Sequence, residues 1–196
     1  MQGPQYEVET VRIVRPLKII ALVCCVIALL LLIISSATTF WLESKGYRQG
    51  LFEECFDKLP PNPDGCHRNE NKAWIQACAA LAIIAMIITL GGILVTAYGL
   101  YTKEPGRKSL LYMIATGLMF FAALCLVIAL IVFPSMFMQE INWRTSKVPN
   151  REWYFSWGYG VAWGSAIFMV GAAILLLLDR ESNEIYYKEN VYYDNR

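Results

Sequence analysis

Residues 73–102 read AWIQACAALAIIAMIITLGGILVTAYGLYT, and no Asp, Glu, Lys, Arg or His interrupts them. The stretches 19–42, 109–139 and 153–178 share this property. Each has at least about 20 residues, enough helix to cross a hydrocarbon core of about 30 Å. Because the backbone must satisfy its own hydrogen bonds inside lipid, each stretch is predicted to be an α-helix. The sequence therefore predicts a four-span membrane protein.

The rest of the chain is arranged around these four runs, and we expect one membrane domain over residues 1–196. Hydrophobic residues make up 57% of the chain and charged residues 17%, against about 45–50% and about 25% in soluble domains. The lipid bilayer is thus the first expected partner. The predicted layout has spans at 19–41, 74–101, 110–136 and 155–178, extracellular loops at 42–73 and 137–154, and cytoplasmic tails at 1–18 and 179–196.

The orientation follows from the positive charges near the span ends. The short segment 103–108 packs three cations, Lys103, Arg107 and Lys108, into one tight turn. Cytoplasmic loops carry an excess of Lys and Arg, and short loops dominate this rule. Both termini are therefore expected in the cytoplasm. The net charge of +1 gives no basic field that would predict a nucleic-acid partner.

Two of the six cysteines, Cys55 and Cys66, fall in the long first loop on either side of a turn-forming insert, PPNPDG. If this loop is extracellular, the oxidising compartment makes Cys55–Cys66 the natural disulfide. The other four cysteines lie in or near spans and are expected to be small buried apolar residues. Palmitoylation of Cys24 and Cys25 is the alternative. A metal site is disfavoured because the loop offers too few ligands.

The spans lack the residues that chemistry or transport needs. Charged residues inside a membrane usually mark ion paths, proton relays and substrate sites, and none lies in the four runs. The sequence also shows no nucleophile–base pair, phosphate-binding glycine loop or metal pattern. We therefore expect no enzyme, no cofactor and no metal.

Glycines and aromatic residues give further expectations. Gly160 and Gly164 form a small-xxx-small pattern that predicts close helix packing, either inside the bundle or in self-association through a dimer face. Pro134 predicts a kink or break near the end of the third span. Residues 38–42 and 46–56 are rich in β-prone residues and predict short antiparallel strands. The tail tyrosines are candidate contact or phosphorylation sites, with a merely soluble tail as the alternative: Tyr186, Tyr187, Tyr192 and Tyr193.

A tryptophan at the end of the first span, then Gly-Leu-aromatic, then two cysteines resembles the claudin signature. Here it stands as Trp41, Gly50-Leu51-Phe52, Cys55 and Cys66, with Phe52 where claudins have tryptophan. The wider superfamily includes peripheral myelin protein and the epithelial membrane proteins.

Two further motifs carry the resemblance. They are Phe133-Pro134 at the end of the third span and the sequence FSWGYGVAWG at 155–164. Together with the short tail that carries acidic and tyrosine residues, they make the chain most similar to the branch that contains transmembrane protein 47 and PERP.

This resemblance implies a claudin-like, all-α four-helix membrane bundle with a small extracellular antiparallel β-sheet, stapled by Cys55–Cys66. It implies a plasma-membrane protein of cell–cell junctions, whose partners are junction or adhesion proteins. One alternative is an auxiliary subunit of a channel or receptor. Another is a paracellular channel or barrier former, with charged loop residues lining the pore: Glu53, Glu54, Asp57 and Lys58.

Overall fold

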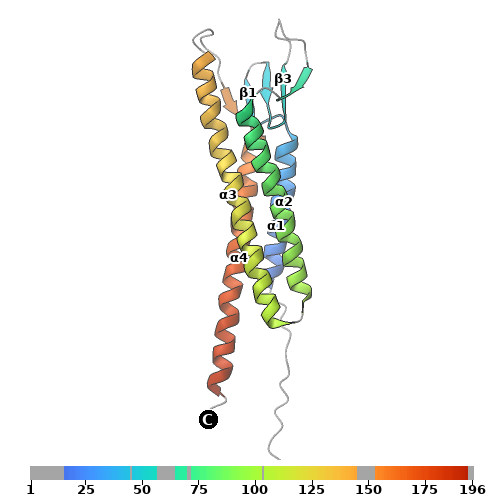
Figure 1. Ribbon diagram of the computed structural model, residues 1–196, viewed down its shortest axis with the longest axis vertical. Coiled ribbons are helices and arrows are strands. Elements are labelled where there is room, and N and C mark those ends of the chain that lie inside the picture. The colour runs from blue at the N-terminus through green and yellow to red at the C-terminus, as the bar shows by residue number, and fades with distance from the viewer. Residues whose placement is uncertain are drawn as a thin grey trace, which may run out of the picture.

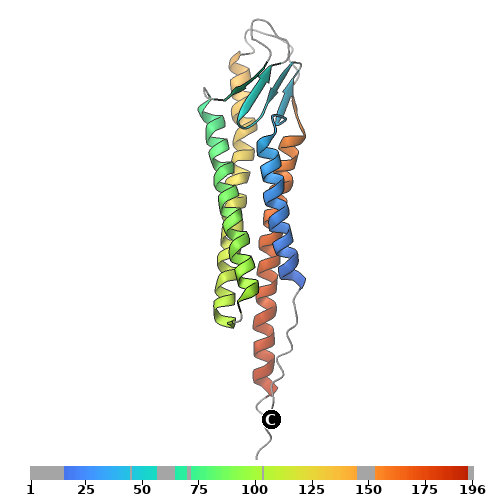
Figure 2. The same ribbon diagram turned by 90° about the vertical axis from the view of Figure 1, so that its right-hand side faces the viewer.

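The computed structural model describes residues 16–44, 46–56, 65–69, 72–102, 104–144 and 153–193. Its four helices are α1 (Pro16–Ala37), α2 (Ala73–Tyr101), α3 (Pro105–Arg144) and α4 (Trp157–Tyr193). They run side by side along the long axis of the molecule (Figures 1 and 2). Each contains a stretch long and apolar enough to cross a membrane. The predicted four-helix membrane bundle is confirmed.

The helix ends differ from the predicted span ends. α1 ends at Ala37, four residues before the predicted limit, while α3 runs on to Arg144 and α4 to Tyr193. Apolar composition marks only the part of a helix that lies in lipid, whereas backbone hydrogen bonding continues into polar sequence. The four tail tyrosines therefore belong to the helical continuation of α4. The last three residues lie outside the described part of the chain.

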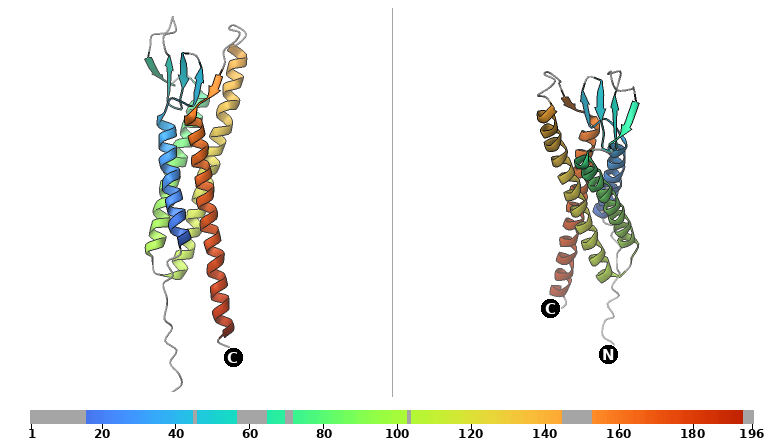
Figure 3. Two further views of the ribbon diagram at one scale, coloured as in Figure 1. Left: turned by 180° about the vertical axis from the view of Figure 1, so that it is seen from behind. Right: turned by 45° about the horizontal axis from the view of Figure 1, so that its top comes forward.

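A five-stranded antiparallel sheet caps one end of the bundle, opposite the last residues of α4 (Figure 3). The strand order is β4-β3-β2-β1-β5, so four strands of the first loop are joined at one edge by a strand from the second. The small antiparallel sheet was predicted. Its strands are β1 (Leu42–Ser44), β2 (Tyr47–Gln49), β3 (Glu53–Phe56), β4 (Gly65–Arg68) and β5 (Trp153–Phe155).

Strand β5 corrects the predicted start of the fourth span. Residues 153–155 are uncharged and aromatic, so hydropathy assigns them to the apolar run that follows. Aromatic residues are equally favoured in strands. Because β1 offers a free edge, Leu42 pairs with Phe155 and Ser44 with Trp153, and the helix begins only at Trp157.

Inside the bundle, glycines of α2 permit close packing against α3. A Cβ on Gly92 would lie 2.9 Å from Met119 Sδ, and one on Gly99 would lie 3.1 Å from the ring of Tyr112. Hydroxyl groups add direct links, since Ser165 Oγ of α4 donates a hydrogen bond to the Ala28 carbonyl of α1 at 2.8 Å. Close backbone approach and interhelical hydrogen bonds are the main sources of helix association in lipid.

Candidate interaction site at the sheet and its junction with the bundle

The two faces of the sheet differ sharply in what they carry. Residues paired across antiparallel strands point to the same face, and the register therefore places one continuous row on the outer face: Tyr154, Glu43, Arg48, Cys55 and Cys66. Cys55 and Cys66 are joined by the predicted disulfide, directly across β3 and β4. The opposite face is turned toward the bundle and buries Leu42, Tyr47 and Gln49.

Trp41 is the centre of the junction between sheet and bundle. Its side chain is fully buried and its Nε1 donates a hydrogen bond to the Ser35 carbonyl at 2.7 Å. Its ring centroid lies 5.0 Å from that of Phe133 on α3 and 5.8 Å from that of Tyr159 on α4. Aromatic pairs at such distances add stabilisation beyond their buried area. One tryptophan thus ties the first loop to two helices.

The linker that carries Trp41, residues 38–41, is held by backbone hydrogen bonds on both sides. Trp41 N–H donates to the Gln49 carbonyl at 3.1 Å, and Gly158 N–H donates to the Phe40 carbonyl at 2.9 Å. The Ser35 hydroxyl in turn donates to the Gly158 carbonyl at 2.7 Å. The linker is therefore fixed between β2 and the first turn of α4.

Two glycines make this packing possible. A Cβ on Gly50 would lie 2.5 Å from the Thr38 carbonyl oxygen, and one on Gly158 would lie 2.7 Å from the Phe40 carbonyl oxygen. Backbone atoms cannot move aside as a side-chain end can, so both positions require glycine. Gly50 was predicted as part of the loop signature, and the structure gives its physical reason.

Pro134 lies inside α3, which continues unbroken to Arg144. Proline has no N–H, so the carbonyl four residues earlier, that of Leu130, loses its helical donor. The Tyr159 hydroxyl supplies the missing donor, with a hydrogen bond to the Leu130 carbonyl at 2.8 Å. The two motifs, at 133–134 and at 155–164, are thus linked: a tyrosine of the second supplies the hydrogen bond that the proline of the first removes.

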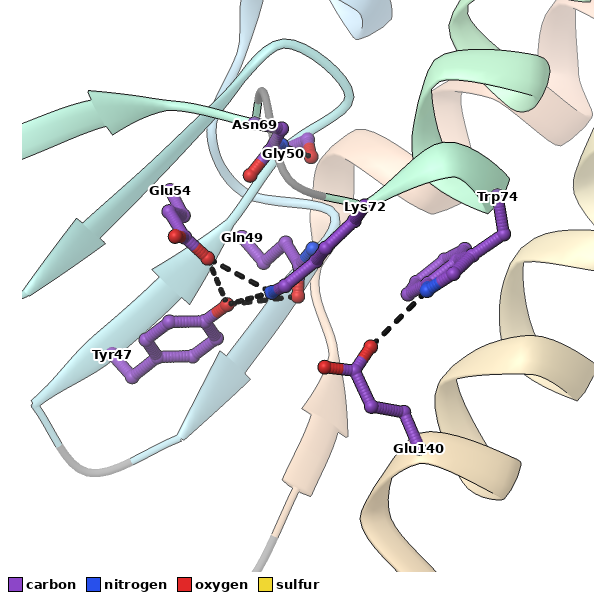
Figure 4. A network of polar contacts seen from close by, with 8 residues as sticks. All are labelled: Tyr47, Gln49, Gly50, Glu54, Asn69, Lys72, Trp74 and Glu140. Carbon is purple, nitrogen blue, oxygen red and sulfur yellow. Dashed lines mark hydrogen bonds and ion pairs between the residues drawn. The ribbon is translucent and has the colours of Figure 1, made fainter. Parts of the chain in front are cut away.

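A polar network fastens the inner face of the sheet to the start of α2 (Figure 4). Lys72 Nζ lies 2.9 Å from Glu54 Oε2 on β3 and donates a hydrogen bond to Tyr47 Oη on β2 at 3.3 Å. The Lys72 and Glu54 side chains are 16% and 21% exposed, so solvent screens the pair only in part. Asn69 Nδ2 adds a hydrogen bond to the Gly50 carbonyl at 3.1 Å.

The Tyr47 hydroxyl has two neighbours that could accept its single proton, Gln49 Oε1 and Glu54 Oε2, each at 2.9 Å. Gln49 is fully buried and its Nε2 has no acceptor in this arrangement. Turning the amide over gives Nε2 an acceptor, because it then donates to Tyr47 Oη while the hydroxyl proton goes to Glu54. In this orientation of the amide, the Glu54 carboxylate accepts hydrogen bonds from both Tyr47 and Lys72.

Trp74, two residues after Lys72, contacts α3, whereas Lys72 contacts the sheet. Its Nε1 donates a hydrogen bond to Glu140 Oε2 at 3.1 Å, on the part of α3 that follows Pro134 (Figure 4). Its ring also packs edge-on against Phe133, with centroids 5.6 Å apart. The first turn of α2 therefore contacts both the sheet and the outer end of α3, and sequence reasoning missed this arrangement because neither pair is local.

The comparisons with known proteins agree with this architecture. The family model described as PMP-22/EMP/MP20/Claudin family matches residues 15–176. The chain belongs to this family. It is also 29% identical, over 154 residues, to the "p53 apoptosis effector related to PMP-22" of Danio rerio, a match that covers 76% of this chain and 77% of the relative. That relative supports the PERP branch of the family.

In this family member, the signature residues of the first loop form one cluster. Leu51 is buried and Phe52 is half-buried against the same core, below the sheet. Trp41, at the end of the predicted first span, is enclosed by protein. Its sequence position suggested an interfacial anchor, but the linker folds back and carries the indole into the core. Trp157, by contrast, is 52% exposed.

Gly160 does not pack inside the bundle of this claudin-family chain, and the alternative, a dimer face, stays a prediction. Apart from its own helix backbone, no described atom lies within 4 Å of a Cβ placed on Gly160, and at Gly164 such a Cβ would lie 3.8 Å from Leu31 Cδ1. The pattern has the right spacing, but α4 turns its buried side at Gly158 and Ala162 toward the bundle, which leaves Gly160 on the exposed side. The close approaches occur at Gly92, Gly99 and Gly158 instead.

Proposed function

We propose that this claudin-family protein is a non-enzymatic tetraspan of cell–cell junctions. It organises junction or adhesion complexes through lateral contacts and through its extracellular sheet. The observation that carries the proposal is the sheet itself, a small recognition surface held rigidly by a disulfide, an aromatic core and a polar network. Pre-organisation of this kind lowers the entropy that binding costs.

The orientation is part of the proposal. The disulfide favours an oxidising compartment, which supports an extracellular position for the sheet. The last residues of α4 and the turn before α3 are at the opposite end of the bundle (Figure 2). Both termini are then cytoplasmic, as the positive charges of the 103–108 turn favour. The helical tail with its tyrosines projects from that side.

The outer row of the sheet supplies a surface for partners. Glu43 is exposed and lies opposite Arg48 on β2 and Tyr154 on β5, so opposite charges and an aromatic ring stand side by side. Glu53 and Arg68 form a second cross-strand pair of opposite charge. Such mixed patterns give specificity and orientation at an interface more than raw affinity.

One of the charged residues that the paracellular channel alternative would place in a pore, Glu54, is already paired. Glu54 is bonded to Lys72 and Tyr47 on the inner face of the sheet, so it does not offer a free carboxylate to a pore. Glu53 is exposed, and Asp57 and Lys58 lie outside the described residues. Transepithelial conductance after expression distinguishes a channel former from a junction organiser. Recovery of a stoichiometric pore-forming protein on co-purification would indicate the auxiliary-subunit alternative.

The main test is proximity labelling from the cytoplasmic tail in polarised cells, together with imaging at contacts. We expect junction and adhesion proteins among the labelled neighbours. Glu43→Lys should reduce enrichment at contacts without reducing delivery to the surface. Glu104→Lys makes the same charge change at the other end of the bundle, beside Arg107, and should leave enrichment unchanged. Equal behaviour of the two variants would contradict a role for the outer row.

A further inference from the structure

Where the sheet meets the start of α4, three flat groups are stacked on the outer side of the sheet. The Arg48 guanidinium carbon lies 5.0 Å from the centroid of the Phe40 ring. The Phe40 ring in turn stacks on the Trp157 indole, with the two centroids 6.0 Å apart and the ring planes at 30°. Because Phe40 covers one face of the indole and Trp157 is 52% exposed, the stack ends on an open aromatic face.

Glu43 brings a negative charge to this end of the stack. It is exposed and belongs to the outer row of the sheet, between Arg48 on β2 and Tyr154 on β5. Its Oε2 lies 3.5 Å from the hydroxyl oxygen of Ser156, the residue immediately before Trp157. Within the part of the chain that the structure describes, Glu43 makes no ion pair. An exposed carboxylate therefore lies beside the open indole.

An aromatic face beside a carboxylate suits a quaternary ammonium group. The ring quadrupole attracts a cation within about 6 Å of the centroid, and tryptophan attracts it most strongly. The methyl groups of such a cation pack on the ring, while the carboxylate adds a charge–charge attraction. Arg48, on the far side of Phe40, repels a lone cation. The cluster therefore favours a ligand that joins its quaternary ammonium to an anionic group.

The depth of the cluster indicates that this ligand is a lipid headgroup. Trp157 is the first residue of the apolar segment Trp157–Leu178, and an exposed tryptophan at the end of a span lies at headgroup level. Gly160 and Gly164 follow on the same side of α4, one and two turns further into the span. Apart from its own helix backbone, no described atom lies within 4 Å of a Cβ placed on Gly160. This side of α4 therefore has room for an acyl chain below the indole.

We propose that Trp157 and Glu43 bind the phosphocholine headgroup of a lipid from the leaflet on the side of the sheet. The trimethylammonium group lies on the open face of the indole, next to the Glu43 carboxylate. The phosphate of the same headgroup offsets the repulsion from Arg48, which keeps its place over Phe40. An acyl chain runs along α4 past Gly160. This lipid site goes beyond the proposed junction function and does not depend on it.

The test uses the full-length protein in nanodiscs that hold equal amounts of phosphatidylcholine, phosphatidylethanolamine and phosphatidylglycerol with the same acyl chains. Native mass spectrometry then counts the lipids that stay bound. We expect the wild type to retain phosphatidylcholine about threefold over each of the other two. Trp157→Leu removes the ring and should abolish the preference over phosphatidylethanolamine. Glu43→Gln removes only the charge and should reduce the preference over phosphatidylglycerol.

Trp163→Leu and Glu53→Gln are the matched controls. Trp163 is a second exposed tryptophan on α4, and Glu53 is a second exposed carboxylate on the sheet. Both variants should keep the wild-type preference.

Four results would overturn the proposal. Equal losses for Trp157→Leu and Trp163→Leu would mean a general effect of tryptophan in lipid. A wild type without lipid preference would mean that the site does not exist. A Trp157→Leu variant that melts lower than the wild type in phosphatidylglycerol alone would assign the loss to folding. Full displacement of the lipid by soluble phosphocholine would assign the site to a soluble choline compound.

Discussion

Gly158 and Gly160 stand two residues apart on α4 and have opposite surroundings. A Cβ on Gly158 would lie 2.5 Å from Thr38 Cγ2, whereas one on Gly160 would meet nothing within 4 Å. Only Gly160 belongs to the small-xxx-small pattern with Gly164. The comparison teaches that spacing identifies a face of a helix, while the fold decides whether that face meets protein or lipid.

The same contrast holds for the two regions to which these glycines belong. At the junction, Trp41, Tyr159 and Gly158 each have several defined contacts, in rings, hydrogen bonds and backbone. On the outward side of α4, Ile167 is 68% exposed. Changes at the junction should therefore cost stability, and changes on the outward side should cost little, because lipid tails accept most apolar shapes.

Trp41→Ala should give the largest loss. Removing a fully buried tryptophan leaves a cavity between the linker, α3 and α4, and it should lower the free energy of unfolding by about 3–5 kcal/mol. Reversible unfolding of the purified protein in mixed micelles measures this quantity. Trp157→Ala, at an exposed tryptophan, is the control and should cost much less. Similar costs for both variants would show that the junction is not the stabilising core.

Gly158→Ala should come next, at about 1–3 kcal/mol, because the added methyl group must displace the Phe40 backbone. Gly160→Ala should change stability by no more than about 0.5 kcal/mol. The midpoints of thermal unfolding in one detergent compare the two directly. If alanine at position 160 proved the more damaging, Gly160 would have a partner that the single chain does not supply.

Tyr159→Phe should cost about 1–2 kcal/mol, because the Leu130 carbonyl then loses the hydroxyl donor that replaces the N–H missing at Pro134. A double-mutant cycle sharpens the test. In a Pro134→Ala background the helix regains its own N–H donor for that carbonyl, so Tyr159→Phe should cost clearly less there. Additive effects of the two changes would refute the proposed coupling.

Glu54→Gln should have the smallest effect at the junction, about 1 kcal/mol, since the pair with Lys72 is partly exposed. Glu104→Gln removes the partner of the exposed Arg107 and should have no measurable effect. Chemical unfolding of the two variants side by side is the measurement. A neutral Glu54→Gln would mean that the aromatic contacts alone hold the sheet on the bundle.

Much of the fold was predictable because its signals are local. Uninterrupted apolar runs gave the four spans, and the turn-rich spacer between Cys55 and Cys66 gave the disulfide. Strand β5 was not predictable, since its three residues are as apolar as the helix that follows. The complete burial of Trp41 was not predictable either, because a tryptophan at the end of a span is the usual interfacial anchor.

The sequence by itself determined that this chain crosses a membrane four times, because lipid excludes charge and forces the backbone into helices. It also determined which two cysteines could meet, since both lie in one short loop. Only the tertiary structure decided that Tyr159 supplies the hydrogen bond that Pro134 removes, and that Gly158, not Gly160, is the glycine in close contact. These outcomes depend on how helices rotate against one another, and that rotation is set by packing between segments far apart in the chain.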